Sequence, residues 1–368
     1  MSFPVLKIGD LTATTPIVQG GMGVGISLSR LAAAVANEGG IGVIAGAMVG
    51  MREPDVASNP IEANTRALRR EIEKARELTS GIIGVNIMVA LTTFPELVKT
   101  SVAAGADVIF SGAGLPMDLP KLFQETCEEH KQEFRTKLVP IVSSGRAATL
   151  IAKKWAAKTG LMPDAFVLEG PKAGGHLGFG KDDLFKEEFA LENLVGGVVD
   201  AAKALEDKAG RAIPVICGGG VFSGEDIARM ISLGASGVQM ATRFVATEEC
   251  DADIRFKQAY VNATEDDITI IQSPVGMPGR ALKGTFIDAS REGKKKPFKC
   301  VFHCIKTCDP ENTPYCISSA LINAMKGNLD KGFVFCGSNV GRMKSIVTVR
   351  ELIDSLRTEY DEYMESQA

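Results

Sequence analysis

Short apolar runs alternate with polar, periodic segments over the first 245 residues of the chain. Eight runs are continuous and apolar, as expected of strands buried on both faces of a parallel sheet. They are residues 16–22, 41–47, 84–89, 107–111, 137–144, 165–169, 213–220 and 237–244. The segments between them carry apolar residues at helical spacing. These predicted helices are residues 27–37, 60–79, 95–104, 119–129, 147–158, 191–209 and 224–233.

Eight consecutive β–α units favour a closed (β/α)8 TIM barrel of the α/β class. Periodicity does not show whether a sheet closes, so a doubly wound open sheet is the alternative. Residues 5–14 predict a short hairpin or an extended lead-in ahead of the first strand, and Ser27 or Ser29 is expected to cap the first helix. Glycines and polar residues follow the predicted strands, which is the end where barrel enzymes have their active sites.

The alternation stops beyond residue 265, and this change divides the chain into three predicted parts. Residues 1–265 form the barrel, and residues 266–345 form a lid or cap over its mouth, where substrate specificity is expected to lie. Residues 346–368 contain a closing amphipathic helix that packs on the barrel.

Composition argues against several classes of protein. The chain has 368 residues and a net charge of −4, which argues against a nucleic-acid-binding surface. No segment approaches the roughly 18–20 apolar residues of a membrane span, and the first residues lack the pattern of a signal peptide. We therefore expect a cytoplasmic protein that acts on a small molecule, with a homodimer left open.

Four of the eight cysteines cluster at positions 300, 304, 308 and 316. On a helix, Cys300 and Cys308 would be about 12 Å apart, and Pro310 ends any helix there. The spacing matches neither the common zinc patterns nor a ferredoxin run. We therefore expect reduced thiols in the lid and no metal, with a metal or iron–sulfur site as the alternative.

Two glycine-containing turns predict a phosphate site. Gly218, Gly219 and Gly220 end the seventh strand, and Ala241 and Thr242 follow the eighth. In barrels the loops after these two strands frequently bind phosphate. The glycines lack the spacing of a dinucleotide-binding fingerprint. A tight turn without a ligand is the alternative.

A histidine and two amides are the other candidate site residues. His176 lies among glycines in the loop after the sixth strand, where it could transfer protons near a cofactor. A structural histidine bonded to backbone is the alternative. Asn86 and Gln19 lie in apolar strands, and their amides must bond either a ligand or neighbouring backbone.

These segments together resemble the flavin-dependent barrels that include nitronate monooxygenase (2-nitropropane dioxygenase) and enoyl-acyl-carrier-protein reductase II. The likeness covers about residues 5–250. It is carried by Pro16-Ile-Val-Gln-Gly-Gly-Met22, residues 31–40, Gly84-Val-Asn-Ile-Met88, Ser111-Gly-Ala-Gly114, Ala173-Gly-Gly-His-Leu-Gly178, residues 214–220 and residues 239–244.

The resemblance implies a noncovalently bound FMN at the barrel mouth and makes His176 the catalytic residue. The implied cofactor-binding residues are Gln19, Gly20, Gly21 and Met22 along the ring, Asn86 at its edge, Ser144 from the fifth strand, Lys172, Ala173, Gly174 and Gly175 beside it, and Gly218, Gly219, Gly220, Ala241 and Thr242 at the phosphate. The chain departs from the family at Lys172, where glutamate is usual, and at Ala241, where glycine is usual.

Two activities fit this resemblance. The first is an FMN-dependent ene-reductase that takes hydride from NADH or NADPH and reduces an activated C=C bond of an enoyl thioester or enone. The second is a nitronate monooxygenase that oxidises alkyl nitronates. The thiols and Lys172 favour reductive chemistry, so the reductase is the preferred hypothesis. A flavin- or phosphate-binding protein without turnover is a third option, but it leaves His176 unexplained.

Overall fold

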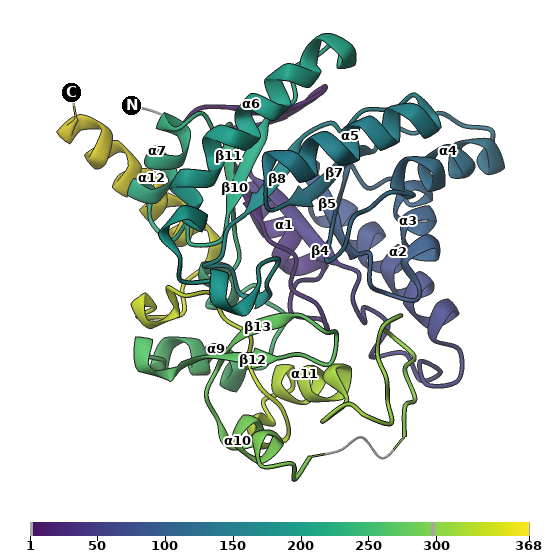
Figure 1. Ribbon diagram of the computed structural model, residues 1–368, viewed down its shortest axis with the longest axis vertical. Helices are drawn as coiled ribbons and strands as arrows, with labels where there is room; N and C mark the ends of the chain where they lie inside the picture. Colours follow the sequence, from purple (N-terminus) through teal and green to yellow (C-terminus); the bar gives the residue numbers. More distant parts are fainter. Residues whose placement is uncertain (1–2, 296–298, 368) are drawn as a thin grey trace.

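Eight parallel strands close into a barrel in the computed structural model, which describes residues 3–295 and 299–367 (Figure 1). The hydrogen-bonded order around the barrel is β10-β11-β3-β4-β5-β6-β7-β8. The predicted TIM barrel is therefore confirmed. The strands are β3 (Ile17–Gln19), β4 (Ile41–Ala45), β5 (Ile82–Met88), β6 (Val108–Gly112), β7 (Lys137–Val142), β8 (Phe166–Glu169), β10 (Val215–Gly218) and β11 (Gly237–Met240).

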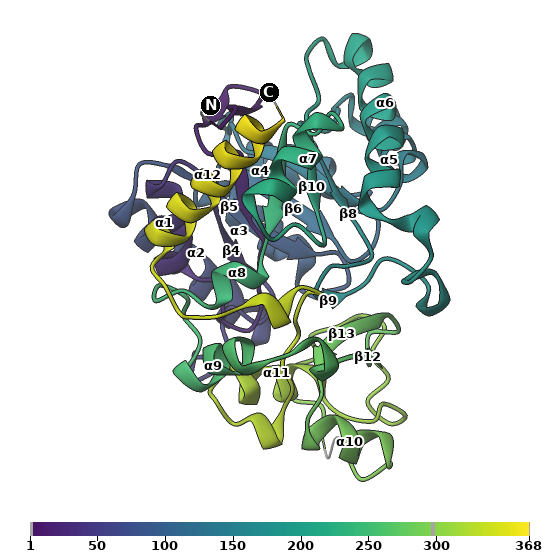
Figure 2. The same ribbon diagram turned by 90° about the vertical axis from the view of Figure 1, so that its left-hand side faces the viewer.

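Helices surround the barrel, and the last helix of the chain completes the ring. Helix α12 (Val349–Ser366) packs against α7 and α1 (Figure 2). It therefore covers the eighth strand, which is followed directly only by the short α8 (Thr242–Val245). The other barrel helices are α1 (Ser29–Asn37), α2 (Pro60–Leu78), α3 (Phe94–Ala103), α4 (Leu119–His130), α5 (Gly145–Thr159), α6 (Leu191–Ala209) and α7 (Gly224–Ser232).

The expected N-terminal hairpin is present as β1 (Leu6–Ile8) and β2 (Leu11–Ala13). Its side chains Leu6 and Ile8 join the apolar cluster formed inside the barrel by residues such as Phe110. Apolar side chains thus fill the barrel below its mouth, which leaves the carboxyl ends of the strands as the place for a ligand.

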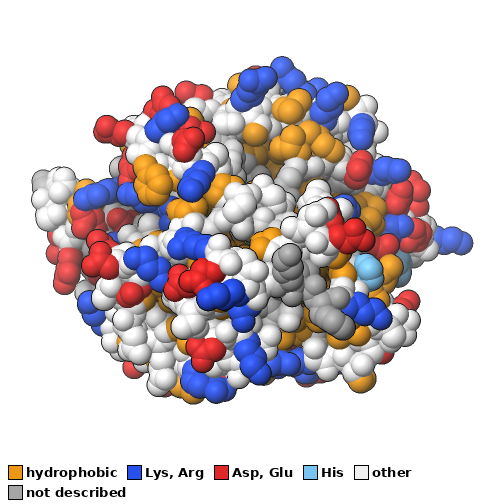
Figure 3. All heavy atoms as spheres, turned by 60° about the horizontal axis from the view of Figure 1, so that its bottom comes forward, with side chains coloured by type: hydrophobic (Ala, Val, Ile, Leu, Met, Phe, Trp, Pro, Cys, Tyr) orange, Lys and Arg blue, Asp and Glu red, His pale blue; other side chains and the backbone are white. Residues whose placement is uncertain are grey.

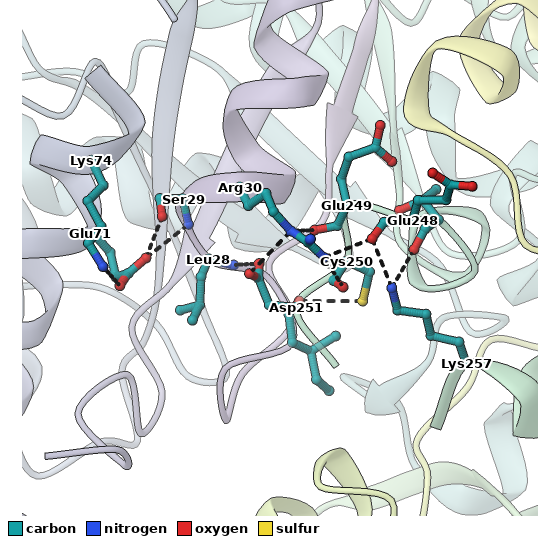
Figure 4. Close-up of polar contacts among 12 residues, drawn as sticks. Leu28, Ser29, Arg30, Glu71, Lys74, Glu248, Glu249, Cys250, Asp251 and Lys257 are labelled. Atoms are coloured by element: carbon teal, nitrogen blue, oxygen red, sulfur yellow. Dashed lines mark hydrogen bonds and ion pairs between the residues drawn. The ribbon is translucent and has the colours of Figure 1, made fainter. Parts of the chain in front are cut away.

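The N-terminus of α1 is capped by distant carboxylates and not, as predicted, by Ser27 or Ser29 (Figure 4). Asp251 accepts a hydrogen bond from the Leu28 amide at 3.1 Å, and Glu71 accepts from the Ser29 amide at 3.2 Å. The Ser29 hydroxyl also donates to Glu71, at 2.6 Å. The local pattern could not reveal this cap, because Asp251 lies 223 residues from its partner in sequence.

Arg30 fixes the chain where it leaves the barrel after the eighth strand. Its guanidinium donates to the backbone oxygens of Glu248, Glu249 and Cys250, at 2.8, 3.1 and 3.1 Å (Figure 4). Nearby, Lys257 donates to the backbone oxygens of Thr247 and Glu248. These bonds anchor the first residues of the following segment to the barrel wall.

That segment, residues 246–348, forms a layer at one end of the barrel and is called the lid below (Figure 2). Its sheet has the order β12-β13-β9, and β9 (Gly175–His176) comes from the barrel loop after β8. The other lid elements are α9 (Ile254–Asn262), β12 (Ile268–Gln272), β13 (Pro278–Leu282), α10 (Thr285–Arg291) and α11 (Ile317–Met325). Short 3-10 turns lie at Lys181–Asp183, Glu187–Phe189, Glu265–Asp267, Leu329–Lys331 and Val340–Arg342.

The surface seen from the lid side carries acidic and basic side chains interspersed with one another (Figure 3). No helix within residues 3–295 and 299–367 is long and apolar enough to cross a membrane.

Candidate active site

A cavity of about 550 Å³ lies between the carboxyl ends of the barrel strands and the lid. Its lower wall comes from the barrel, and the opposite wall, called the roof below, is largely apolar and comes from the lid. The roof residues are Val275, Met277, Ile305, Ile317, Leu321 and Phe335. A site of this size and composition is typical of small-molecule and cofactor binding.

Most of the residues predicted from the sequence line this one cavity. They are Gly20, Gly21, Met22, Asn86, Lys172, Ala173, Gly174, Gly175, His176, Gly219, Gly220, Ala241 and Thr242. Three predicted cofactor-binding residues, Gln19, Ser144 and Gly218, are not among the lining residues.

The side chains of Gln19 and Ser144 are engaged by the protein itself. The buried Gln19 amide donates to the Gly20 oxygen at 2.5 Å and accepts from the Val43 amide at 3.0 Å. Ser144 caps α5 by accepting from the Ala147 amide at 3.3 Å. The neighbouring Ser143 faces the cavity in its place. Both differences arise because backbone groups at strand and helix ends need partners.

Gly21 and Asn86 are matched to each other across the cavity floor. A Cβ atom on Gly21 would lie 2.3 Å from the Cβ of Asn86, so a larger residue does not fit there without displacing Asn86. Among the described residues, no protein group hydrogen-bonds the Asn86 side-chain amide, which lines the cavity. Asn86 is therefore available to bond a ligand with both a donor and an acceptor.

The two turns after β10 and β11 form a cradle of free amides, consisting of residues 219–221 and 241–242. Gly219 and Gly220 have φ values of +88° and +122°, and a Cβ on Gly219 would lie 2.6 Å from the Gly170 oxygen. Within the described parts of the chain, the N–H groups of Gly220, Val221 and Thr242 have no protein acceptor. Converging backbone amides of this kind suit an anion such as phosphate.

The end of the lid supports the cradle from outside. The Asn339 side-chain amide donates to the Gly220 oxygen at 2.6 Å, and the Gly337 amide donates to the Thr242 hydroxyl at 3.2 Å. The positions of the two turns are thus set partly by residues about 100 positions further along the chain.

His176 is held by three separate elements. Its backbone in β9 pairs with Gly279 of β13, its Nε2 atom lies 2.7 Å from the Ser273 hydroxyl, and its ring packs edge-on against Phe335 with centroids 5.0 Å apart. Burial lowers its pKa from 6.5 to about 4. The imidazole is therefore neutral at neutral pH and able to accept a proton.

Glu169 is a cavity residue that the sequence reasoning missed. It ends β8 and lines the cavity, and burial raises its pKa from 4.5 to about 7. Among the described residues, its carboxyl group has no hydrogen-bond or ion-pair partner. The signal was present in the sequence, because Glu169 is a polar residue at the carboxyl end of an apolar strand, as is Asn86.

Two lid residues also position the loop after β8, and no local sequence pattern indicates this role. Ser273 contacts His176 across 97 residues of sequence, and Arg280 donates to the backbone oxygen of Pro171 across 109. A single serine in a turn and a single arginine in a short strand do not predict contacts over such distances in sequence.

The clustered cysteines lie in the lid as free thiols. Cys304 lies 3.0 Å from the Ser318 hydroxyl, and burial raises the pKa of its thiol to about 11. In the described part of the chain, no three His, Cys, Asp or Glu side chains are placed to hold a metal ion.

Comparison with known proteins assigns the chain to a family. The family model described as nitronate monooxygenase matches residues 6–359. The chain belongs to the nitronate monooxygenase family. The resemblance predicted from the sequence motifs is therefore confirmed, and proteins of this family are generally flavin-dependent.

Individual relatives include a CoA-ester dehydrogenase and a probable nitronate monooxygenase. The chain is 28% identical to the (3aS,4S,5R,7aS)-5-hydroxy-7a-methyl-1-oxo-octahydro-1H-indene-4-carboxyl-CoA dehydrogenase of Mycobacterium tuberculosis, over 76% of this chain and 66% of that protein. It is 28% identical to a probable nitronate monooxygenase of Staphylococcus aureus, over 76% and 78%. The solved structure of FabK from Thermotoga maritima superposes with a TM-score of 0.71 at 28% identity, covering 96% of this chain and 94% of that one.

Proposed function

We propose that this protein is an FMN-dependent ene-reductase, which uses NADH or NADPH to reduce the activated C=C bond of an enoyl thioester or enone. The observation that carries the proposal is the apolar roof facing the cradle. A roof that includes Ile305, Ile317 and Leu321 provides contact for an acyl chain beyond the space near the cradle. The relative named as a carboxyl-CoA dehydrogenase is consistent with a thioester substrate.

The residues of the cavity fit an FMN. The amides of Gly220, Val221 and Thr242 would hold its phosphate, and Asn86 would bond a polar edge of the ring system. Gly20 and Gly21 line the same cavity, and the missing side chain of Gly21 allows Asn86 to keep its place there. Bound FMN would supply the two-electron chemistry that amino-acid side chains lack.

The protein groups would place the substrate and supply the proton. Reduction of an activated C=C bond adds a hydride to one carbon and a proton to the other. His176 and Ser273 form a hydrogen-bonded pair in which either group can donate. Glu169, whose pKa burial raises to about 7, is a second group on the cavity wall that carries a proton near neutral pH. The lid contacts His176 directly, through Ser273 and Phe335.

A nitronate monooxygenase activity is the second candidate, favoured by the protonation state of His176. Burial lowers the pKa of this histidine to about 4, so the imidazole is unprotonated at neutral pH. A neutral imidazole can accept a proton from the acidic carbon of a nitroalkane, which converts the nitroalkane to the nitronate that such an enzyme oxidises.

We also propose that residues 266–345 determine substrate choice, because all six roof residues come from this segment. Steady-state assays of the FMN-reconstituted protein test the proposed function. They compare NADPH or NADH oxidation in the presence of a trans-2-enoyl-CoA with oxygen consumption in the presence of an alkyl nitronate. Nicotinamide oxidation that depends on the enoyl thioester supports the reductase, whereas turnover confined to the nitronate supports the second candidate.

A further inference from the structure

The lid holds the backbone around Lys172 in a fixed position. Three successive carbonyl groups, those of Pro171, Lys172 and Ala173, accept hydrogen bonds from lid residues. The buried Arg280 donates to the Pro171 oxygen at 2.8 Å and to the Ala173 oxygen, and the Ser338 amide donates to the Lys172 oxygen at 3.1 Å. Because the carbonyls on both sides are held, the direction in which the Lys172 side chain leaves the loop is also set.

The aliphatic part of Lys172 lies on the cradle. A Cβ atom added to Gly220 would lie 3.2 Å from the Cβ of Lys172 and 3.3 Å from its Cδ. Lys172 lines the same cavity as the free amides of Gly220 and Thr242. Its ammonium group is therefore attached to a stem that already contacts the proposed phosphate site.

The ammonium group has no counter-ion in the protein. Within residues 3–295 and 299–367, no carboxylate lies within 4.0 Å of it, although the side chain is exposed to the cavity. By contrast, Lys186, which lies between β9 and α6, is paired with Asp183 at 2.6 Å. An unpaired cation next to amides without acceptors is the charge arrangement expected around a bound dianion.

We propose that Lys172 binds the phosphate group of the flavin and thereby makes the site selective for FMN over riboflavin. The inference rests on the proposed binding of FMN and adds a phosphate contact to it. The resemblance placed Lys172 beside the ring, whereas its contact with Gly220 directs it to the phosphate. A phosphate monoester carries almost two negative charges at neutral pH, so one ammonium contact adds a charge-assisted hydrogen bond to those of the amides.

Flavin titrations of the purified, flavin-free protein test this role. Dissociation constants for FMN and for riboflavin are measured by flavin fluorescence for the wild type, Lys172→Met and Lys172→Glu. Lys181→Met is the matched control, since Lys181 is also exposed but does not line the cavity. We expect Lys172→Met to weaken FMN binding about tenfold, as for the loss of one charge-assisted hydrogen bond. Lys172→Glu should weaken it more, and neither variant should change riboflavin binding.

The outcomes separate this inference from the proposed function. Wild-type protein that binds neither flavin would remove the basis of both. If the wild type binds FMN and Lys172→Met binds it with the same affinity, Lys172 does not contact the phosphate. The proposed function would then be unaffected. An unchanged FMN affinity combined with a higher KM for NADPH, but not for NADH, would show that Lys172 contacts the nicotinamide phosphate and would also overturn the proposal. An equal loss of riboflavin affinity would indicate a distorted loop and contradict a specific phosphate contact.

Discussion

The Nε2 atom of His176 lies 2.7 Å from the hydroxyl oxygen of Ser273, and this hydrogen bond joins the barrel to the lid. His176 comes from the loop after β8, whereas the buried Ser273 lies in the turn between β12 and β13. The lid hairpin thus orients the histidine as well as covering it. Because of this hydrogen bond, we expect the lid to influence the reaction as well as substrate binding.

Removing the Ser273 hydroxyl should slow turnover without affecting the flavin. Ser273→Ala leaves Nε2 of His176 without its protein partner, and a lost neutral hydrogen bond of this kind is worth about 1 kcal/mol. We expect kcat to fall about five- to tenfold and the FMN dissociation constant to stay the same. Steady-state kinetics and a fluorescence titration measure the two effects, with Ser290→Ala in α10 as the control. An unchanged kcat would contradict an orienting role for Ser273.

His176 should stay neutral over the range in which most histidines titrate. Burial lowers its pKa from 6.5 to about 4, so the folded protein resists protonation until the pH falls well below 6. The chain has only three histidines, which allows their ring signals to be assigned by single substitutions. In an NMR titration of the flavin-free protein, the His176 signal should not shift between pH 8 and pH 5. A midpoint near 6.5 would show that the ring is solvated and would remove this argument for a neutral imidazole.

Glu169 should make the folded protein less stable as the pH rises. Its pKa is raised from 4.5 to about 7 in the folded state, so between these values the folded protein binds more protons than the unfolded chain. The stability contribution is therefore full below pH 4.5 and is lost progressively up to about pH 7, by about 3 kcal/mol in total.

Urea unfolding of the flavin-free protein at several pH values tests this linkage. Glu169→Gln cannot ionise, so its stability relative to wild type should rise between pH 5 and pH 8. The exposed Glu192→Gln in α6 is the control and should track the wild type. Parallel pH profiles for wild type and Glu169→Gln would contradict the raised pKa.

Enlarging Gly21 should weaken flavin binding. In Gly21→Ala the new methyl group would lie 2.3 Å from the Cβ of Asn86, so Asn86 must move out of its place on the cavity floor. We expect the variant to fold and to bind FMN at least tenfold more weakly, in keeping with the cost of overpacking. Gly196→Ala in α6 is the control, because nothing lies within 4 Å of the added atom. Equal FMN binding by wild type and Gly21→Ala would show that the ring does not use this wall.

The barrel was predictable from the sequence because its signals are local. Apolar runs such as residues 165–169 bury both faces of each strand, and glycines follow at the strand ends. The lid was less accessible, because its central contact pairs His176 with Gly279 and so joins residues about 100 positions apart. Periodicity within a segment does not report such pairings.

The difference between local and long-range signals also explains which site residues could be predicted. The cradle could be predicted because the order of strands fixes which turns meet at the mouth, as Gly220 and Thr242 do. Gln19 and Ser144 are polar and lie at the expected ends, but each satisfies a backbone group next to it. Whether a polar side chain turns to the backbone or to the cavity is decided by three-dimensional packing, which the sequence pattern does not contain.

Anaerobic reduction of the FMN-loaded protein tests the proposed activity most directly. The visible absorbance of the oxidised flavin is followed after addition of NADPH or NADH, and then after addition of a trans-2-enoyl-CoA. We predict that one of the nicotinamides bleaches the flavin and that the enoyl thioester restores its absorbance. A flavin that neither nicotinamide bleaches, but that an alkyl nitronate does, would contradict the reductase and establish the oxidation of nitronates in its place.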